Sequence, residues 1–140
     1  MPPSMVMSSR FRRGSDSSPT VFNRAFIGNF SDCHGGGVAS INGSSQVVCK
    51  PAFVQCVFEG NETLCDGGGF YTDGGNCVFL YCEFKANRAV SGGGLHDLAG
   101  IPVLYDYGFE CNEATQGGAF ILVRAPSPTS PVAPSGSIRP

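Results

Sequence analysis

The chain has 140 residues, a net charge of −2 and a charged fraction of only 14%. This length suits one domain, and the weakly acidic charge excludes the basic surface that attracts nucleic acid. The sequence has no apolar run of the roughly 20 residues that cross a membrane as a helix, so a helical membrane-spanning protein is excluded as well.

Composition divides the chain into three parts. Residues 1–19 are rich in serine and contain three prolines without any periodic pattern, so we expect a disordered leader. Residues 124–140 contain five prolines, which predict an extended, disordered tail. The part between them, residues 20–123, contains only two prolines and is the expected folded domain.

A short motif recurs four times in this domain. In each copy Phe-x-x-Asn is followed, five or six residues after the asparagine, by a glycine cluster and one apolar residue. The four Phe-x-x-Asn segments span residues 26–29, 58–61, 84–87 and 109–112. Successive phenylalanines are 32, 26 and 25 residues apart, and an insertion within residues 39–53 explains the longer first interval. Such a period indicates a repeat protein that stacks similar units.

The period selects among repeat folds. It is too long for a hexapeptide β-helix and too short for helical repeats of about 33–47 residues. Leucine-rich repeats share the period, but this chain has only six leucines and none two residues after a motif asparagine. Glycine clusters and runs of β-branched and aromatic residues disfavour helix. We therefore predict an all-β fold, a short right-handed parallel β-helix (β-solenoid) of three to four coils.

The repeat also predicts two internal columns. Stacked coils place equivalent residues about 4.8 Å apart, so aromatic rings stack inside and turn amides bond from coil to coil. The expected columns are Phe26, Phe58, Phe84 and Phe109, and Asn29, Asn61, Asn87 and Asn112.

The repeated motifs resemble those of a known protein family. Phe-x-x-Asn paired with Gly-Gly-Ala and an apolar residue is similar to the repeats of the polymorphic outer membrane proteins of chlamydiae and related surface proteins of some protists. Residues 117–120 are the closest glycine match, whereas Gly37, Gly69 and Gly94 stand where that family usually has alanine. The resemblance covers roughly residues 26–122. It implies a pectate-lyase-like β-helical passenger domain, located outside the cell or on its surface, with an adhesive role.

The seven cysteines include two pairs in equivalent repeat positions, Cys33 with Cys65 and Cys56 with Cys82. Each pair predicts either small apolar residues facing inward or a disulfide between neighbouring coils, although adjacent parallel strands offer poor dihedral geometry for it. The odd number leaves at least one thiol unpaired. Zinc is disfavoured because no Cys-x-x-Cys occurs, and we expect no metal and no cofactor.

Catalytic β-helices gather carboxylates on one face of neighbouring coils. In this chain we expect only Glu59 and Glu110 to share a column, with Lys85 between them, which indicates a solvated face with charge pairing. His96 has no nucleophile nearby in the sequence, so we expect a surface imidazole and not a general base. We therefore predict no catalytic residue.

These observations favour a non-catalytic surface or adhesion module, a fragment of a larger passenger domain. We expect a host-cell or glycan ligand, and the insertion within residues 39–53 is either its binding site, because departures from a minimal repeat often carry binding, or a loop that the fold merely tolerates. Further β-helix coils or end-to-end self-association would cover the ends of the stack. The alternative is a polysaccharide-active lyase or glycosidase-like enzyme, or an inactive relative, with a groove beside Glu59 and Glu110.

Overall fold

The structure is a computed structural model that describes residues 4–5, 9–12, 19–41, 50–74 and 76–123. These residues form 18 short strands and no helix, and every strand pairs in parallel with its neighbours. The prediction of an all-β parallel β-helix is therefore confirmed.

Four coils follow one another along the stack, and each contributes four strands. Coil 1 consists of β3 (Thr20–Phe22), β4 (Ala25–Ile27), β5 (Phe30–Ser31) and β6 (Val38–Ile41). Coil 2 consists of β7 (Ala52–Val54), β8 (Val57–Glu59), β9 (Glu62–Thr63) and β10 (Phe70–Asp73). Coil 3 consists of β11 (Val78–Leu80), β12 (Glu83–Lys85), β13 (Arg88–Ser91) and β14 (Leu95–Leu98). Coil 4 consists of β15 (Val103–Tyr105), β16 (Gly108–Glu110), β17 (Glu113–Gln116) and β18 (Phe120–Val123).

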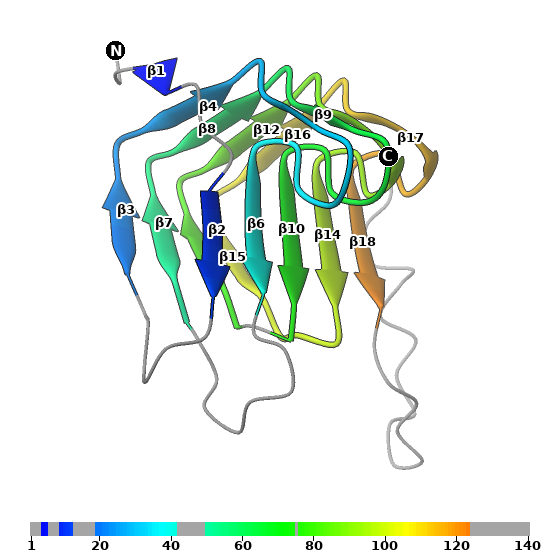
Figure 1. Ribbon diagram of the computed structural model, residues 1–140. Coiled ribbons are helices and arrows are strands. Elements are labelled where there is room, and N and C mark those ends of the chain that lie inside the picture. The colour runs from blue at the N-terminus through cyan, green and yellow to red at the C-terminus, as the bar shows by residue number, and fades with distance from the viewer. Residues whose placement is uncertain (1–3, 6–8, 13–18, 42–49, 75, 124–140) are drawn as a thin grey trace.

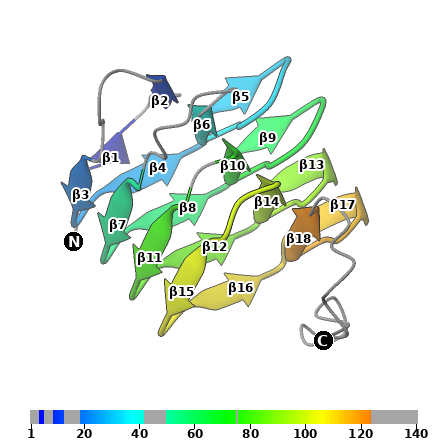
Figure 2. The same cartoon turned by 90° about the horizontal axis from the view of Figure 1, so that it is seen from below.

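Equivalent strands of successive coils form four parallel sheets (Figures 1 and 2). We name them sheet A (β4, β8, β12, β16), sheet B (β6, β10, β14, β18), sheet C (β3, β7, β11, β15) and sheet D (β5, β9, β13, β17). Two further strands, β1 (Ser4–Met5) and β2 (Ser9–Arg12), pair with β4 and β6. The structure thus assigns two strands within residues 1–19, where the sequence predicts disorder. The expected tail, 124–140, lies outside the described residues.

The core is filled by aromatic rings from three of the sheets. In sheet A the rings of the four motif phenylalanines stack nearly parallel from coil to coil, with centroids 5.1, 4.8 and 4.7 Å apart. Phe53 and Phe79 of sheet C stack at 5.5 Å, and Phe70 of sheet B meets Phe79 edge-on at 4.9 Å. Offset stacking and edge-to-face contacts are the favoured geometries of such rings.

The motif asparagines close the turn between sheets A and D. The backbone N–H and the side-chain Nδ2 of Asn61 both donate to Oδ1 of Asn87, each at 3.0 Å. The same Nδ2 also donates at 2.8 Å to the carbonyl oxygen of Phe26, in the preceding coil. Asn61 and Asn87 are fully buried, so this ladder satisfies amides that would otherwise be costly to bury.

A glycine cluster then lets neighbouring coils approach closely between sheets D and B. A Cβ on Gly68 would lie only 2.5 Å from the carbonyl oxygen of Gly93 and 2.6 Å from that of Arg88. No larger residue fits this position without moving the backbone. Within the part of the chain that the structure describes, no helix is long and apolar enough to cross a membrane.

Candidate functional site

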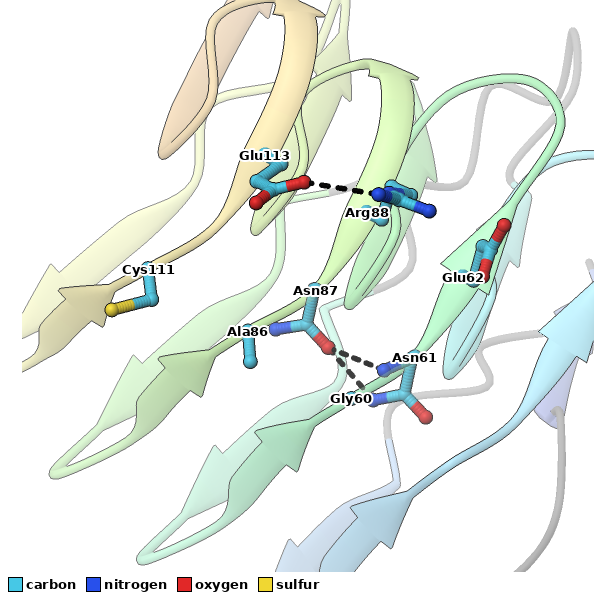
Figure 3. A pocket seen from close by; sticks show the side chains of 8 residues that line it. All are labelled: Gly60, Asn61, Glu62, Ala86, Asn87, Arg88, Cys111 and Glu113. Carbon is cyan, nitrogen blue, oxygen red and sulfur yellow. Dashed lines mark hydrogen bonds and ion pairs between the residues drawn. The ribbon is translucent and has the colours of Figure 1, made fainter.

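An open pocket of about 240 Å³ lies at the turn between sheets A and D, across coils 2, 3 and 4 (Figure 3). It is lined by Gly60, Asn61, Glu62, Ala86, Asn87, Arg88, Cys111 and Glu113. The asparagine ladder forms its floor, and charged side chains from β9, β13 and β17 stand beside it. The repeat that builds the fold therefore also builds this pocket.

The backbone turns sharply at the residue before each motif asparagine. Gly60, Ala86 and Cys111 occupy this position with φ values of 66°, 52° and 55°. A left-handed conformation suits glycine and costs energy for alanine and cysteine. The turn sends the asparagine side chain inward to the ladder and leaves the residues on either side of it on the outer surface.

Charges alternate from coil to coil around this turn. The three segments read Glu-Gly-Asn-Glu at 59–62, Lys-Ala-Asn-Arg at 85–88 and Glu-Cys-Asn-Glu at 110–113, and we name them together the charged corner. Strand register places Lys85 between Glu59 and Glu110. The same register places Arg88 between Glu62 and Glu113. A basic coil thus lies between two acidic coils.

The ion pairs of the charged corner are exposed to solvent. Arg88 Nη2 lies 3.3 Å from Glu113 Oε2, with side chains that are 63% and 69% exposed. Lys85 Nζ pairs at 3.0 Å with Oε1 of Glu83, which lies on the same strand outside the corner, and this hydrogen bond, with smaller contributions from Glu110 and Glu59, raises the pKa of Lys85. Exposed pairs of this kind stabilise a fold little, so a ligand can reorganise them at small cost.

The structure corrects the expectation about carboxylate columns. Glu59 and Glu110 do share a column with Lys85, but they are not the only such pair. Glu62 and Glu113 form a second column around Arg88. The sequence already contained the signal for this second column, because Glu62, Arg88 and Glu113 each directly follow a motif asparagine.

The prediction that His96 is a surface imidazole is wrong. His96 is only 5% exposed, because its ring stacks on Tyr71 at 5.5 Å and Tyr71 in turn stacks on His34 at 4.3 Å. Burial lowers the pKa of His96 and nearby His34 lowers it further, whereas Asp66 acts in the opposite direction. The side chain is therefore part of a covered stack on sheet B, away from the charged corner.

The two cysteine pairs differ in burial. Cys56 and Cys82 are fully buried, and the hydrogen bond between their thiols, together with burial, raises the pKa of Cys82. Cys33 is exposed and Cys65 is half-buried. None of the described cysteines forms a disulfide, and no group of three or more His, Cys, Asp or Glu among the described residues is arranged to hold a metal ion.

Most of the insertion expected to bind a ligand, residues 42–49, lies outside the described residues. Comparison with known proteins gives no family assignment, because no protein-family model, no curated protein and no solved structure matches the chain. Among the described residues, the charged corner is therefore the candidate binding site.

Proposed function

We propose that this protein is a non-catalytic surface module that binds a neutral glycan at the charged corner. The observation that carries the proposal is the alternation of acidic, basic and acidic coils beside an open pocket. Sugar hydroxyls both donate and accept hydrogen bonds, so a polyhydroxylated chain can satisfy carboxylates and cations in turn.

The charge pattern disfavours a strongly charged ligand. A polyanion along the corner meets carboxylates on two of the three coils, and a polycation meets Lys85 and Arg88 in the middle coil. Like charges placed together weaken binding and act against such partners. A neutral oligosaccharide that crosses the coils avoids both conflicts.

The alternative function is cleavage of a polysaccharide. Glu59 and Glu110 share a column and could act as an acid and base pair. In both columns, however, a cation separates the two carboxylates, and Arg88 pairs with Glu113. A bound sugar would have to displace these cations before two carboxylates could flank its glycosidic bond. We therefore favour binding without catalysis.

We also propose that the protein acts outside the cell or on its surface, and that further coils or other copies of the chain are its partners. The fourfold Phe-x-x-Asn and glycine repeat, through its resemblance to chlamydial surface proteins, supports an adhesive role outside the cell or on its surface. Among the described residues, β15, β16, β17 and β18 each pair with only one strand. Their free edges support stacking of further coils or end-to-end self-association.

The binding proposal is tested with a panel of neutral and uronate-containing oligosaccharides against the purified chain. We expect a neutral glycan to bind, and Arg88→Glu to weaken its affinity by about tenfold or more, as loss of a charged hydrogen bond does. Arg24→Glu is the matched control, because Arg24 is also exposed but lies outside the pocket.

Three results would contradict this assignment. Unchanged affinity in Arg88→Glu would exclude the charged corner. If deletion of residues 42–49 alone removed binding, the site would lie in the insertion. New reducing ends or unsaturated products from a polysaccharide, lost in Glu59→Gln, would establish the enzymatic alternative.

A further inference from the structure

Two cysteines occupy equivalent positions at an accessible turn of coils 1 and 2. Cys33 lies between β5 and β6, and Cys65 lies between β9 and β10. We propose that Cys33 and Cys65 are a modification site, where oxidation forms a disulfide that ties coil 1 to coil 2. This inference is independent of the glycan proposal, because the turn lies outside the pocket.

The two turns have the same local structure. The backbone N–H of Cys33 donates to Ser31 Oγ at 3.2 Å, and that of Cys65 donates to Thr63 Oγ1 at 3.2 Å. Each cysteine thus follows a hydroxyl residue by two positions and is held in the same way. Equivalent backbone conformations direct the two thiols to the same side of the stack.

Hydrogen bonds between the turns hold them in contact. The N–H of Leu64 donates to the carbonyl oxygen of Ser31 at 3.2 Å, and the hydroxyl of Thr63 donates to the carbonyl oxygen of Cys33. The Cys65 thiol lies 3.7 Å from the carbonyl oxygen of Asp32 and also contacts the thiol of Cys33. Neighbouring coils are about 4.8 Å apart, within the Cα separation of about 4.4–6.8 Å that a disulfide needs.

The longer turn occurs only in the two coils that carry these cysteines. Six residue steps separate the motif asparagine from the first glycine in coils 1 and 2, and five do so in coils 3 and 4. Asp66 of coil 2 pairs with Ser91 of coil 3 in an isolated parallel bridge, and beyond this bridge the two coils are again in register despite the extra residue in coil 2. The extra residue moves both cysteines out of the regular strand ladder, in which parallel neighbours have poor dihedral geometry for a disulfide.

The second cysteine pair, Cys56 and Cys82, differs from the first because it is buried in the core. The thiols of Cys56 and Cys82 point into the core, and they lie 3.5 and 3.2 Å from the carbonyl oxygens of Val21 and Phe53. Full burial excludes an oxidant from them. Cys33 is exposed and Cys65 only partly covered, so of the two equivalent pairs an oxidant reaches only this one.

The reaction is thiol–disulfide exchange with a small disulfide such as oxidised glutathione. The thiolate of one cysteine attacks the small disulfide, forms a mixed disulfide and releases one reduced glutathione. The thiolate of the other cysteine then attacks the protein sulfur and releases the second glutathione. Two thiols are oxidised, one disulfide is reduced, and the two protons pass to the departing thiolates. Burial, with Cys33, Asp66 and Asp32 nearby, raises the pKa of Cys65, so exchange accelerates as pH rises.

The experiment equilibrates the full chain in a glutathione redox buffer of an oxidising compartment, alkylates the remaining thiols and digests the protein without reduction. Glutamyl endopeptidase cleaves after Glu62, between the two cysteines. We expect a cross-linked peptide pair, two hydrogens lighter than the reduced peptides, whose fragments join Cys33 to Cys65. It should vanish in Cys33→Ser and in Cys65→Ser, and persist in Cys111→Ser, a matched change at another exposed cysteine.

A second measurement does not depend on peptide recovery. Oxidation should raise the thermal midpoint of the wild type and of Cys111→Ser by about 4 °C or more, because the cross-link restricts the unfolded chain. It should leave the midpoint of Cys33→Ser unchanged. Full alkylation of Cys33 and Cys65 in the oxidised sample, or a cross-link that joins a different pair, would overturn the proposal.

Discussion

His96 illustrates how its surroundings determine the charge of a single side chain. It lies on the outer side of β14, yet it is buried, because Tyr71 stacks on its ring and His34 stacks in turn on Tyr71. Tyr71 stacks on its ring, and the charges of Asp66 and His34 act on it. Burial outweighs the favourable carboxylate, so the folded state disfavours the imidazolium form.

This burial predicts a pH dependence of stability. The unfolded chain titrates His96 near pH 6.5, whereas the folded chain binds that proton only at lower pH. Because the unfolded state binds more protons in this interval, the free energy of unfolding should fall as pH decreases from about 7.5 to about 5.5.

Urea denaturation at a series of pH values measures this effect. His96→Phe keeps a ring in the stack and removes the titration, so its free energy of unfolding should vary less over the same interval. His34→Gln keeps His96 and removes the other histidine of the stack, so it measures how much of the pH dependence comes from His34 and its pair with Asp66. An identical pH dependence in wild type and His96→Phe would show that another group is responsible.

The strands are stabilised mainly by the columns of stacked side chains that run from coil to coil, because each strand is too short to be stable alone. Most contain only three or four residues, so the individual strands contribute little alone. The phenylalanine column of sheet A and the asparagine ladder beside it connect all four coils. Loss of one member therefore affects the coils on both of its sides.

Phe84 is the sharpest test of this arrangement. Its ring is fully buried and stacks on Phe58 at 4.8 Å and on Phe109 at 4.7 Å. Phe84→Ala should reduce the free energy of unfolding by about 3–5 kcal/mol, as cavity formation in a packed core does. Tyr105→Ala, at a ring that is 62% exposed, should cost much less in the same denaturation series. Similar losses for the two variants would mean that the column does not stabilise the stack.

At the scale of the whole molecule the stack behaves as a one-dimensional array. Coils 2 and 3 have a described coil on each side, whereas coil 4 pairs only with coil 3. Leu104, Phe109 and Phe120 of coil 4 are accordingly only partly buried. In a solenoid, stability comes from each unit and from its contacts with direct neighbours, so the coils should differ in local stability.

Amide hydrogen exchange should reveal this gradient. We expect the slowest exchange in β7–β14 and faster exchange in β15–β18, because the outer coil opens without breaking the interior. If chains associate end to end, protection of β15–β18 should increase with protein concentration while that of β11–β14 stays constant. Equal protection of coils 3 and 4 at every concentration would contradict both statements.

The repeat spacing by itself predicts the β-helix and the columns on which its core depends. Phe84 and Asn87 recur at the interval of one coil, and in-register parallel pairing places equivalent residues on top of one another. The same spacing identifies the alternating charges at Glu62, Arg88 and Glu113, since a residue one position after the asparagine stays there in every coil.

The tertiary structure alone decided which positions a turn covers. His96 has the sequence surroundings of an exposed residue, but it is buried in a stack in which Tyr71 of the neighbouring coil covers its ring and His34 covers Tyr71. The repeat already pairs Cys33 with Cys65, but only the structure shows that both lie on accessible turns with the same hydroxyl contact. Spacing determines which residues share a column, whereas burial depends on how each turn folds over its neighbours, and that follows from packing between coils.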